Sequence, residues 1–161
     1  MLNSDLFTRV LLEPARSCDR LDIVSGYASP AMAYKHFKAT QKIGKNLRIR
    51  LIVGMVAGDG INEISHKSFV RLQNQDYGGR FECRYSVKLP AVHSKVYVWF
   101  RKQKPVLAFT GSANYSQAAF FERREALAAD SPRQTADYFR SLLPDTQPCD
   151  TATGIHLHKI S

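Results

Sequence analysis

The sequence predicts an α/β domain built on a mixed, mainly parallel β-sheet with helices on both of its faces. Apolar runs of strand length alternate along the chain with amphipathic segments of helix length, an order typical of this fold class. The chain has 161 residues, of which 44% are hydrophobic. A chain of this size can bury about two-thirds of its unfolded surface around one core. We therefore expect one domain over residues 1–144, followed by a linker or tail over residues 145–161 that leads toward a further domain.

The first half of the chain is expected to alternate helices with buried strands. The expected elements are a helix over residues 4–17, a strand over 21–25, a helix from 30 to about 40, a strand over 47–53 and a helix from about 62 to 73. Pro14 should kink or end the first helix, because proline lacks the N–H that an interior helical residue donates. The serine–proline step at 29–30 supplies an N-cap and a first turn. In the helix after residue 62, the side chains of Ile64, Phe69 and Leu72 should face inward.

The second half continues with strands and ends in a helix. The expected elements are strands over residues 81–87, 90–100 and 106–109, a short helix over 116–121, a strand over 125–129 and a helix over 132–143. Ser131 should cap the last helix and Pro144 should end it. The stretch after Pro144 is rich in Asp, Thr and Pro, which is why it is expected to be a linker. The glycine-rich stretch 54–60 is expected to be a plain turn, since no GK[ST] follows it.

The chain is strongly basic, with a formal net charge of +9 and a pI of about 9.7. A protein with this much positive charge most commonly binds the phosphate backbone of a nucleic acid. The alternative is that the charge only keeps the surface soluble. Lys45, Arg48, Arg50 and the basic hairpin turn at 101–104 could track a DNA backbone or simply be solvated.

The composition also bears on location. No run of 18 apolar residues is present, so no membrane span is expected, and the acid-containing N-terminus lacks the basic region of a signal peptide. Cys18, Cys83 and Cys149 are odd in number and far apart. They fit reduced thiols in the cytoplasm better than a disulfide framework or a zinc ribbon.

The stretch from Ala91 to Glu125 carries the strongest chemical signal. If residues 90–100 form a strand, His93 and Lys95 lie on one face, about 7 Å apart at the backbone. Downstream, the turn Thr-Gly-Ser-Ala-Asn at 110–114 offers hydroxyls, an amide and backbone N–H groups that could hold an oxyanion. A nucleophile, a fixed cation and an amide donor, with no acidic cluster beside them, indicate phosphate chemistry that runs without a metal.

This pattern resembles the signature of the phospholipase D superfamily, H-x-K-x4-D followed by G-S-x-N. The matching residues are His93, Lys95, Gly111, Ser112 and Asn114. The chain departs from the signature at Phe100, where the aspartate would stand. That departure, the single motif copy and Glu125 after the turn make the chain similar to the NgoFVII-like restriction endonucleases. Residues 25–29, Ser-Gly-Tyr-Ala-Ser, are also similar to that family, and the resemblance covers roughly residues 4–143.

The resemblance implies the nuclease domain of a restriction endonuclease: a metal-independent DNA phosphodiesterase with no cofactor. It implies that each chain carries half a site, which a homodimer completes through the active-site face. It is also compatible with a separate ATPase subunit. In this scheme His93 of one copy forms a phosphohistidine, and His93 of the other protonates the leaving oxygen. Lys95 and Asn114 then bind the non-bridging oxygens, with Ser112 assisting.

Four further residues are assigned less directly. Glu125 falls at the family spacing for the carboxylate that orients the imidazole, with Glu122 as a competitor. Gly111 lies in the oxyanion turn. Ser25 and Tyr27 lie at the end of a predicted strand, where α/β sheets bind ligands, and could form walls of the site.

Two other functions compete with the DNA phosphodiesterase. A phospholipid hydrolase or transferase of the same superfamily would need an amphipathic or apolar segment to dock on a membrane, and the sequence shows no such segment. A DNA-binding module with a degenerate site would bind DNA without forming a covalent intermediate. The remaining histidines are expected to be structural rather than metal ligands; they are His36, His66, His156 and His158.

Overall fold

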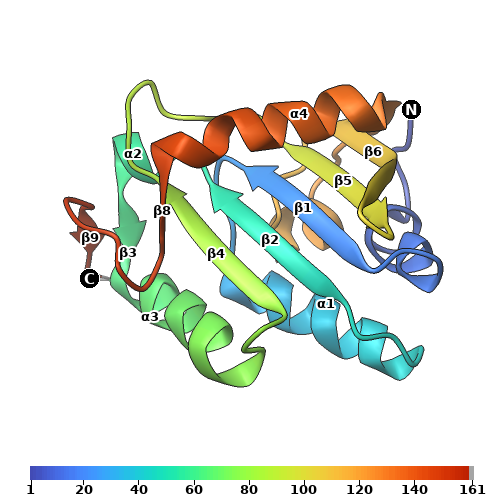
Figure 1. Ribbon diagram of the computed structural model, residues 1–161, viewed down its shortest axis with the longest axis horizontal. Helices are drawn as coiled ribbons and strands as arrows, with labels where there is room; N and C mark the ends of the chain where they lie inside the picture. The colour runs from blue at the N-terminus through green and yellow to red at the C-terminus, as the bar shows by residue number, and fades with distance from the viewer. Residues whose placement is uncertain (160–161) are drawn as a thin grey trace.

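The computed structural model describes residues 1–159, so the last two residues of the expected tail, Ile160 and Ser161, lie outside the described part. One seven-stranded sheet dominates the chain, in the order β7-β6-β5-β1-β2-β4-β8 (Figure 1). The strands are β1 (Arg20–Ser25), β2 (Arg48–Val53), β4 (Phe81–Ser86), β5 (Val96–Arg101), β6 (Lys104–Gly111), β7 (Leu127–Asp130) and β8 (Thr146–Pro148). Strands β1, β2 and β4 pair in parallel, and the outer pairings are antiparallel.

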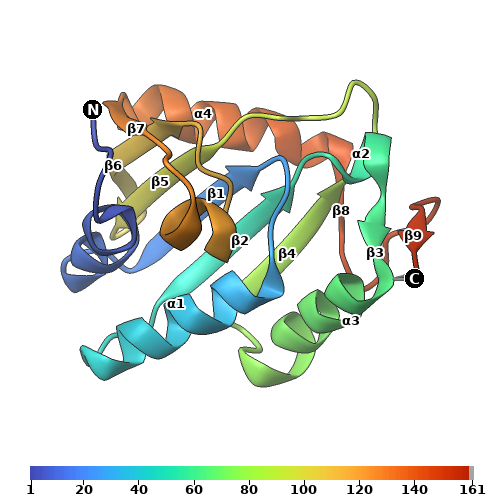
Figure 2. The ribbon, with the colours of Figure 1, turned by 180° about the vertical axis from the view of Figure 1, so that it is seen from behind.

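Helices cover both faces of this sheet, which confirms the predicted α/β class. Figure 2 shows α1 (Pro30–Lys42) and α3 (Glu63–Arg71) on one face, whereas α4 (Pro132–Leu142) lies across the other in Figure 1. A short helix, α2 (Val56–Asp59), follows β2. It precedes a small parallel pair of β3 (Ile61–Asn62) with β9 (Leu157–His158).

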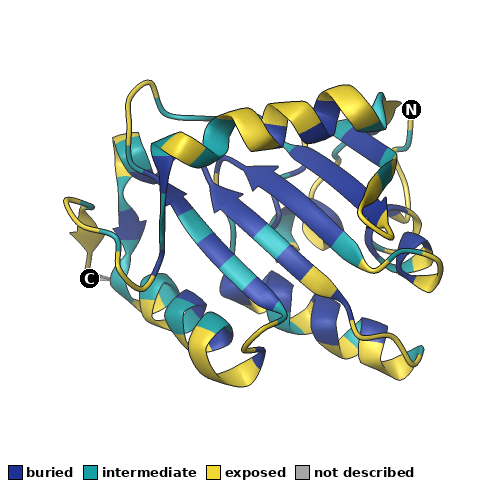
Figure 3. Cartoon of the chain, in the orientation of Figure 1, coloured by how far each residue is buried: buried dark blue, intermediate teal, exposed yellow. Residues whose placement is uncertain are grey.

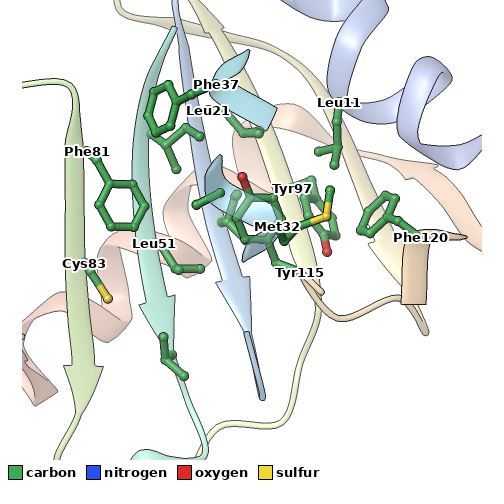
Figure 4. Close-up of a cluster of buried hydrophobic side chains, with 14 of the residues drawn as sticks. Leu11, Leu21, Met32, Phe37, Leu51, Phe81, Cys83, Tyr97, Tyr115 and Phe120 are labelled. Carbon is green, nitrogen blue, oxygen red and sulfur yellow. The ribbon is translucent and has the colours of Figure 1, made fainter. Parts of the chain in front are cut away.

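Two apolar clusters hold the layers together. The larger one joins α1 to the sheet and includes Leu21, Phe37 and Tyr97 (Figure 4). The smaller one packs Phe139 of α4 against Val98 and its neighbours on the opposite sheet face. Because Tyr97 and Val98 are consecutive in β5, their side chains reach opposite clusters, as the period of two in a strand requires.

The predicted caps of two helices are present. The Ser29 side chain accepts a hydrogen bond from the backbone N–H of Met32, and Ser131 accepts one from Gln134. Each cap occupies one of the backbone donors that a helix N-terminus leaves without an internal partner.

The N-terminal helix is less regular than the sequence predicts. Residues 7–12 form a π-helical segment and residues 13–16, which include Pro14, form a 3₁₀ segment. In α3, Phe69 and Leu72 are fully buried as expected, but the prediction for Ile64 is wrong, because this side chain is 61% exposed. Ile64 lies in the first turn of the helix, on a side that the sheet does not cover.

Two expected strands are shorter than the sequence pattern predicts. β5 begins at Val96 rather than at residue 90, and β7 begins at Leu127 rather than at Glu125. Before β5 the N–H of Val92 donates to the Gly54 carbonyl, and before β7 the Ala126 carbonyl accepts from the Ser112 N–H, so both stretches pair outside the regular ladder.

The stretch after residue 145 differs from the linker expected for it. Its strand β8 pairs with β4, and the backbone N–H of Cys149 donates to the carbonyl of Cys83 over 2.9 Å. Cys149 is itself buried, and β9 pairs with β3. Residues 146–158 are therefore packed on the domain rather than extended from it. Figure 3 shows that the buried positions of the chain gather in the central strands of the sheet.

Candidate active site

An extended segment, residues 91–95, carries the motif histidine and lysine over the carboxyl ends of β1 and β2. The backbone N–H of Val92 donates to the carbonyl of Gly54 over 3.0 Å. A Cβ added to Gly54 would lie 2.1 Å from the Val92 oxygen, so only glycine permits this crossing. A Cβ added to Gly26, just after β1, would lie 3.1 Å from Cδ2 of His93. The site thus forms at the sheet edge where α/β proteins commonly bind ligands.

The structure brings His93 and Lys95 together, as the spacing predicts. Nζ of Lys95 lies 3.1 Å from both Nδ1 and Nε2 of His93, and it donates to the His93 carbonyl over 2.7 Å. Equal distances to both ring nitrogens place the ammonium over the face of the imidazole ring. A single anion can therefore contact the imidazole and the ammonium at once.

Burial lowers the pKa of the Lys95 ammonium from its ordinary value, and the Glu125 carboxylate opposes this shift. The partial loss of water around Nζ matters for catalysis, because a less hydrated cation attracts a phosphate oxygen more strongly. The lysine is thus better suited to bind a phosphate group than a fully solvated surface lysine would be.

Asn114 is held by residues that follow β1. Its Oδ1 accepts hydrogen bonds from the Ser25 hydroxyl, at 3.2 Å, and from the backbone N–H of Tyr27, at 3.3 Å. With Oδ1 engaged in this way, the amide NH₂ group remains to donate to a ligand. Since Gly26, between these two partners, contacts His93, the asparagine and the histidine are supported by the same turn.

Ser25 and Tyr27 occupy different positions at the site. Ser25 is fully buried and accepts from the Tyr115 backbone N–H over 2.9 Å, and its one hydroxyl proton is shared between the Tyr27 carbonyl and Oδ1 of Asn114. It therefore lies beneath the site as a support for Asn114. Tyr27 is 46% exposed, its ring lies edge-on to that of His93 at 6.1 Å, and its hydroxyl donates to Asp59.

Gly111 and Ser112 hold the backbone that precedes β7. The Ser112 hydroxyl accepts from the Ala126 N–H over 3.0 Å and lies 3.3 Å from the Ala126 carbonyl. The Gly111 N–H donates to the Lys95 carbonyl over 3.3 Å. This turn therefore ties Lys95 to residue 126, and it places Glu125 near the lysine.

The half-buried Glu125 lies close enough for its charge to act on Lys95. Within residues 1–159, no hydrogen bond joins Glu125 to His93, and the hydrogen bonds of the Lys95 ammonium go to His93 rather than to Glu125. Glu122, the competitor, is exposed. Phe100, where the superfamily signature has aspartate, is buried near the far end of β5 beneath the guanidinium of Arg20, at 4.0 Å.

The other histidines make structural contacts. His36 is fully buried and bonds to the Tyr115 hydroxyl at 2.8 Å and to the Leu11 carbonyl at 2.7 Å. Burial lowers the pKa of His36 to about 4. His66 bonds to the Tyr85 hydroxyl at 2.8 Å. In the part of the chain that the structure describes, no three His, Cys, Asp or Glu side chains are grouped as metal ligands would be.

One contact of the site escapes sequence reasoning. Asp59, which accepts a hydrogen bond from the Tyr27 hydroxyl, lies in the stretch 54–60, for which the sequence predicts a plain turn.

The basic residues of β2 lie at the amino end of this strand, at the opposite end of the sheet from the site. There, Arg20, Arg48, Arg50 and Arg80 line a cavity of about 420 Å³. Over residues 1–159, no helix is long and apolar enough to cross a membrane.

The α/β fold, the His93–Lys95 pair and the Gly111–Asn114 turn together define a phosphodiesterase domain of the phospholipase D type. A family model described as the NgoFVII restriction endonuclease N-terminal PLD domain matches residues 4–154. The chain belongs to this family, and membership supports nuclease or phosphodiesterase activity.

Solved structures share the fold. NucT from Helicobacter pylori superposes with a TM-score of 0.59 at 16% identity, over 89% of this chain and 91% of that one. Nuc from Salmonella typhimurium, a phospholipase D family member, superposes with a TM-score of 0.53 at 17% identity, over 86% of this chain and 87% of that one. A polyphosphate kinase from Porphyromonas gingivalis superposes with a TM-score of 0.57 at 12% identity, over 90% of this chain but 21% of that one. No curated protein sequence shows a significant match.

Proposed function

We propose that this domain is a metal-independent DNA phosphodiesterase, the nuclease domain of a restriction endonuclease. The observation that carries the proposal is the position of Lys95 Nζ, 3.1 Å from both ring nitrogens of His93. A non-bridging oxygen bound by this ammonium would place its phosphorus beside a nucleophilic ring nitrogen. Family membership and the net charge of +9 support DNA as the substrate.

The reaction proceeds in two displacements. A ring nitrogen of His93 attacks phosphorus, an N–P bond forms, and the P–O bond to the leaving oxygen breaks as that oxygen takes a proton. Water then attacks the phosphohistidine, gives up a proton to the same acid–base group, and the N–P bond breaks. Lys95 and the free amide of Asn114 stabilise the charge that builds on the non-bridging oxygens.

The proton donor of the first step comes from a second copy of the chain. In-line displacement needs a nucleophile and an acid on opposite sides of phosphorus. The chain contains two H-x-K sequences before its GSxN turn, but His36 of His36-Phe-Lys38 is fully buried in α1, so His93 is the one such histidine that a phosphate can reach. A homodimer with a two-fold axis through the site supplies His93 twice. The lysines of both copies provide the positive charge that divalent ions provide in two-metal nucleases.

The roles of the supporting residues follow from their contacts. Ser25 holds Asn114, Ser112 and Gly111 hold the backbone beside Glu125, and Tyr27 forms a wall next to His93. Glu125 acts on Lys95 and, once DNA or a second copy is bound, orients the imidazole. The free state of Cys18, Cys83 and Cys149 supports a cytoplasmic location.

Cleavage of supercoiled plasmid DNA in the presence of excess EDTA tests this function. We expect nicked and linear products at an undiminished rate. Loss of cleavage on chelation, with recovery on adding magnesium, would contradict the metal-free mechanism. Hydrolysis of phospholipid vesicles without DNA cleavage would favour the lipid-directed alternative.

A further inference from the structure

A second hollow adjoins the nucleophile on the side of α4. His93 and Ser94 line this cavity of about 480 Å³ together with Leu89, Pro90, Val92 and Tyr138, among others. The size lies within the range of about 300–1,000 Å³ that is usual for small-molecule sites. It is continuous with the catalytic position, because His93 forms part of its wall.

Two large apolar side chains on the wall of this cavity are exposed. Leu89 is 67% exposed and Tyr138 is 38% exposed. Tyr27, which lies edge-on to His93 and is 46% exposed, lines a neighbouring hollow. Exposed apolar side chains beside a hollow mark binding surfaces.

Tyr138 is fixed in place rather than free to move. Its hydroxyl and that of Ser94 lie 2.7 Å apart, so α4 is joined to the segment that carries His93 and Lys95. One edge of the ring is anchored by this bond while the side chain remains partly exposed. An aromatic ring held in this way can stack on a flat ligand at little conformational cost.

We propose that this cavity, which we call the Tyr138 pocket, binds an unpaired nucleobase next to the scissile phosphate. The inference rests on the proposed function, since a phosphodiester bound at His93 carries a nucleoside on each side. The adjoining nucleoside must lie within a few ångströms of the histidine, and the Tyr138 pocket is a hollow that begins there. A base stacked inside a duplex cannot enter, so the base is extruded or belongs to a single strand.

The chemistry of the wall fits a base better than a phosphate. Leu89, Pro90 and Val92 are apolar, and the Lys88 ammonium is directed toward Asp145, at 3.7 Å. Base–aromatic stacking tolerates any base, because each has a π-face. The Tyr138 pocket therefore favours unpaired substrate over paired substrate without reading its sequence.

The test compares two single strands that differ only in their bases. Hexathymidylate and an abasic hexamer of equal charge are bound to the full chain in a His93→Ala background, and affinity is measured by fluorescence anisotropy. We expect Tyr138→Ala to weaken hexathymidylate binding roughly tenfold and to leave the abasic strand unchanged. Tyr138→Phe should retain most of the affinity, because it keeps the ring. Phe121→Ala, which removes an aromatic ring that is 45% exposed elsewhere, is the matched control and should change neither affinity.

Each other outcome overturns the pocket assignment. Equal losses on both strands would show that Tyr138 acts on phosphate binding or on folding, and no loss on either would show that no base enters. A shift in oligomeric state on Tyr138→Ala or Leu89→Ser, seen by sedimentation, would assign the surface to a contact between two copies. Binding is measured here without cleavage, so failure of the proposed catalysis would appear separately, in the plasmid assay.

Discussion

The Ser25 hydroxyl and the Asn114 amide oxygen lie 3.2 Å apart although the two residues are 89 positions apart in the chain. This contact joins the end of a central strand to the turn, residues 111–114, that carries the second part of the proposed site. Because Ser25 is fully buried, it can influence catalysis only through Asn114 and its neighbours. We call it a positioning residue.

Ser25→Ala should therefore reduce activity through orientation. It removes a donor to Asn114 and an acceptor for the Tyr115 N–H, so we expect a loss of about 1–3 kcal/mol in the free energy of unfolding. We also expect a fall in kcat larger than any rise in KM. Ser29→Ala is the matched control, since losing that N-cap costs about 1 kcal/mol but should leave kcat unchanged. Equal effects of the two variants on kcat would show that Ser25 matters only for stability.

Removal of either motif side chain should abolish cleavage. His93→Ala and Lys95→Ala should each reduce the rate by several orders of magnitude, as losses of nucleophiles and charge-stabilising groups do elsewhere. Neither residue belongs to the apolar core, so thermal unfolding should be nearly unchanged. Lys38→Ala, which removes an exposed lysine of α1, should retain full activity. Quenching the wild-type reaction on ³²P-labelled DNA with alkaline detergent, which preserves the acid-labile N–P bond, should trap label on the protein, and His93→Ala should trap none.

Mixed dimers should be nearly inactive. If both copies of His93 serve one composite site, a heterodimer of wild-type and His93→Ala chains lacks either the nucleophile or the acid. Differently tagged chains, co-expressed and purified through both tags, provide this species for a rate measurement. Retention of half of the wild-type rate, or full activity from a monomer in solution, would show that each chain carries a complete site.

Stability should fall in mild acid because of His36. Burial lowers the folded-state pKa of His36 to about 4, whereas the ordinary value is 6.5. Between these values the unfolded chain binds a proton that the folded chain does not, so stability is lost as the pH falls from 6.5 toward 4. The loss attributable to this residue is up to about 3 kcal/mol. Urea unfolding at pH 7 and pH 5 should show the fall, and a His36→Gln variant should show a smaller one; an equal fall in both would assign it to other groups.

The sequence predicts most of the fold because the strands and helices carry strong local patterns. The alternation in β5 and the serine caps at residues 29 and 131 need no knowledge of distant contacts. The pairing of His93 with Lys95 is equally local, since a single residue separates them along an extended chain.

What the sequence does not predict depends on contacts between distant segments. The bond between Ser94 and Tyr138 joins residues 44 positions apart, so no motif reveals the Tyr138 pocket. Strand β8 has no apolar alternation and forms only because β4 offers it a partner edge. Likewise, the exposure of Ile64 depends on how much of α3 the sheet covers, which helical periodicity alone does not specify.

Where Val92 crosses Gly54, the residues that position His93 are distinct from the residues that line the Tyr138 pocket. Backbone contacts at the crossing fix where His93 stands, whereas the preceding loop, residues 87–91, supplies part of the wall of the Tyr138 pocket. The loop can therefore be exchanged while His93, the proposed nucleophile, keeps its position. For protein engineering this makes residues 87–91 the natural place to graft or randomise, as a way to change the proposed base preference without altering the His93–Lys95 pair.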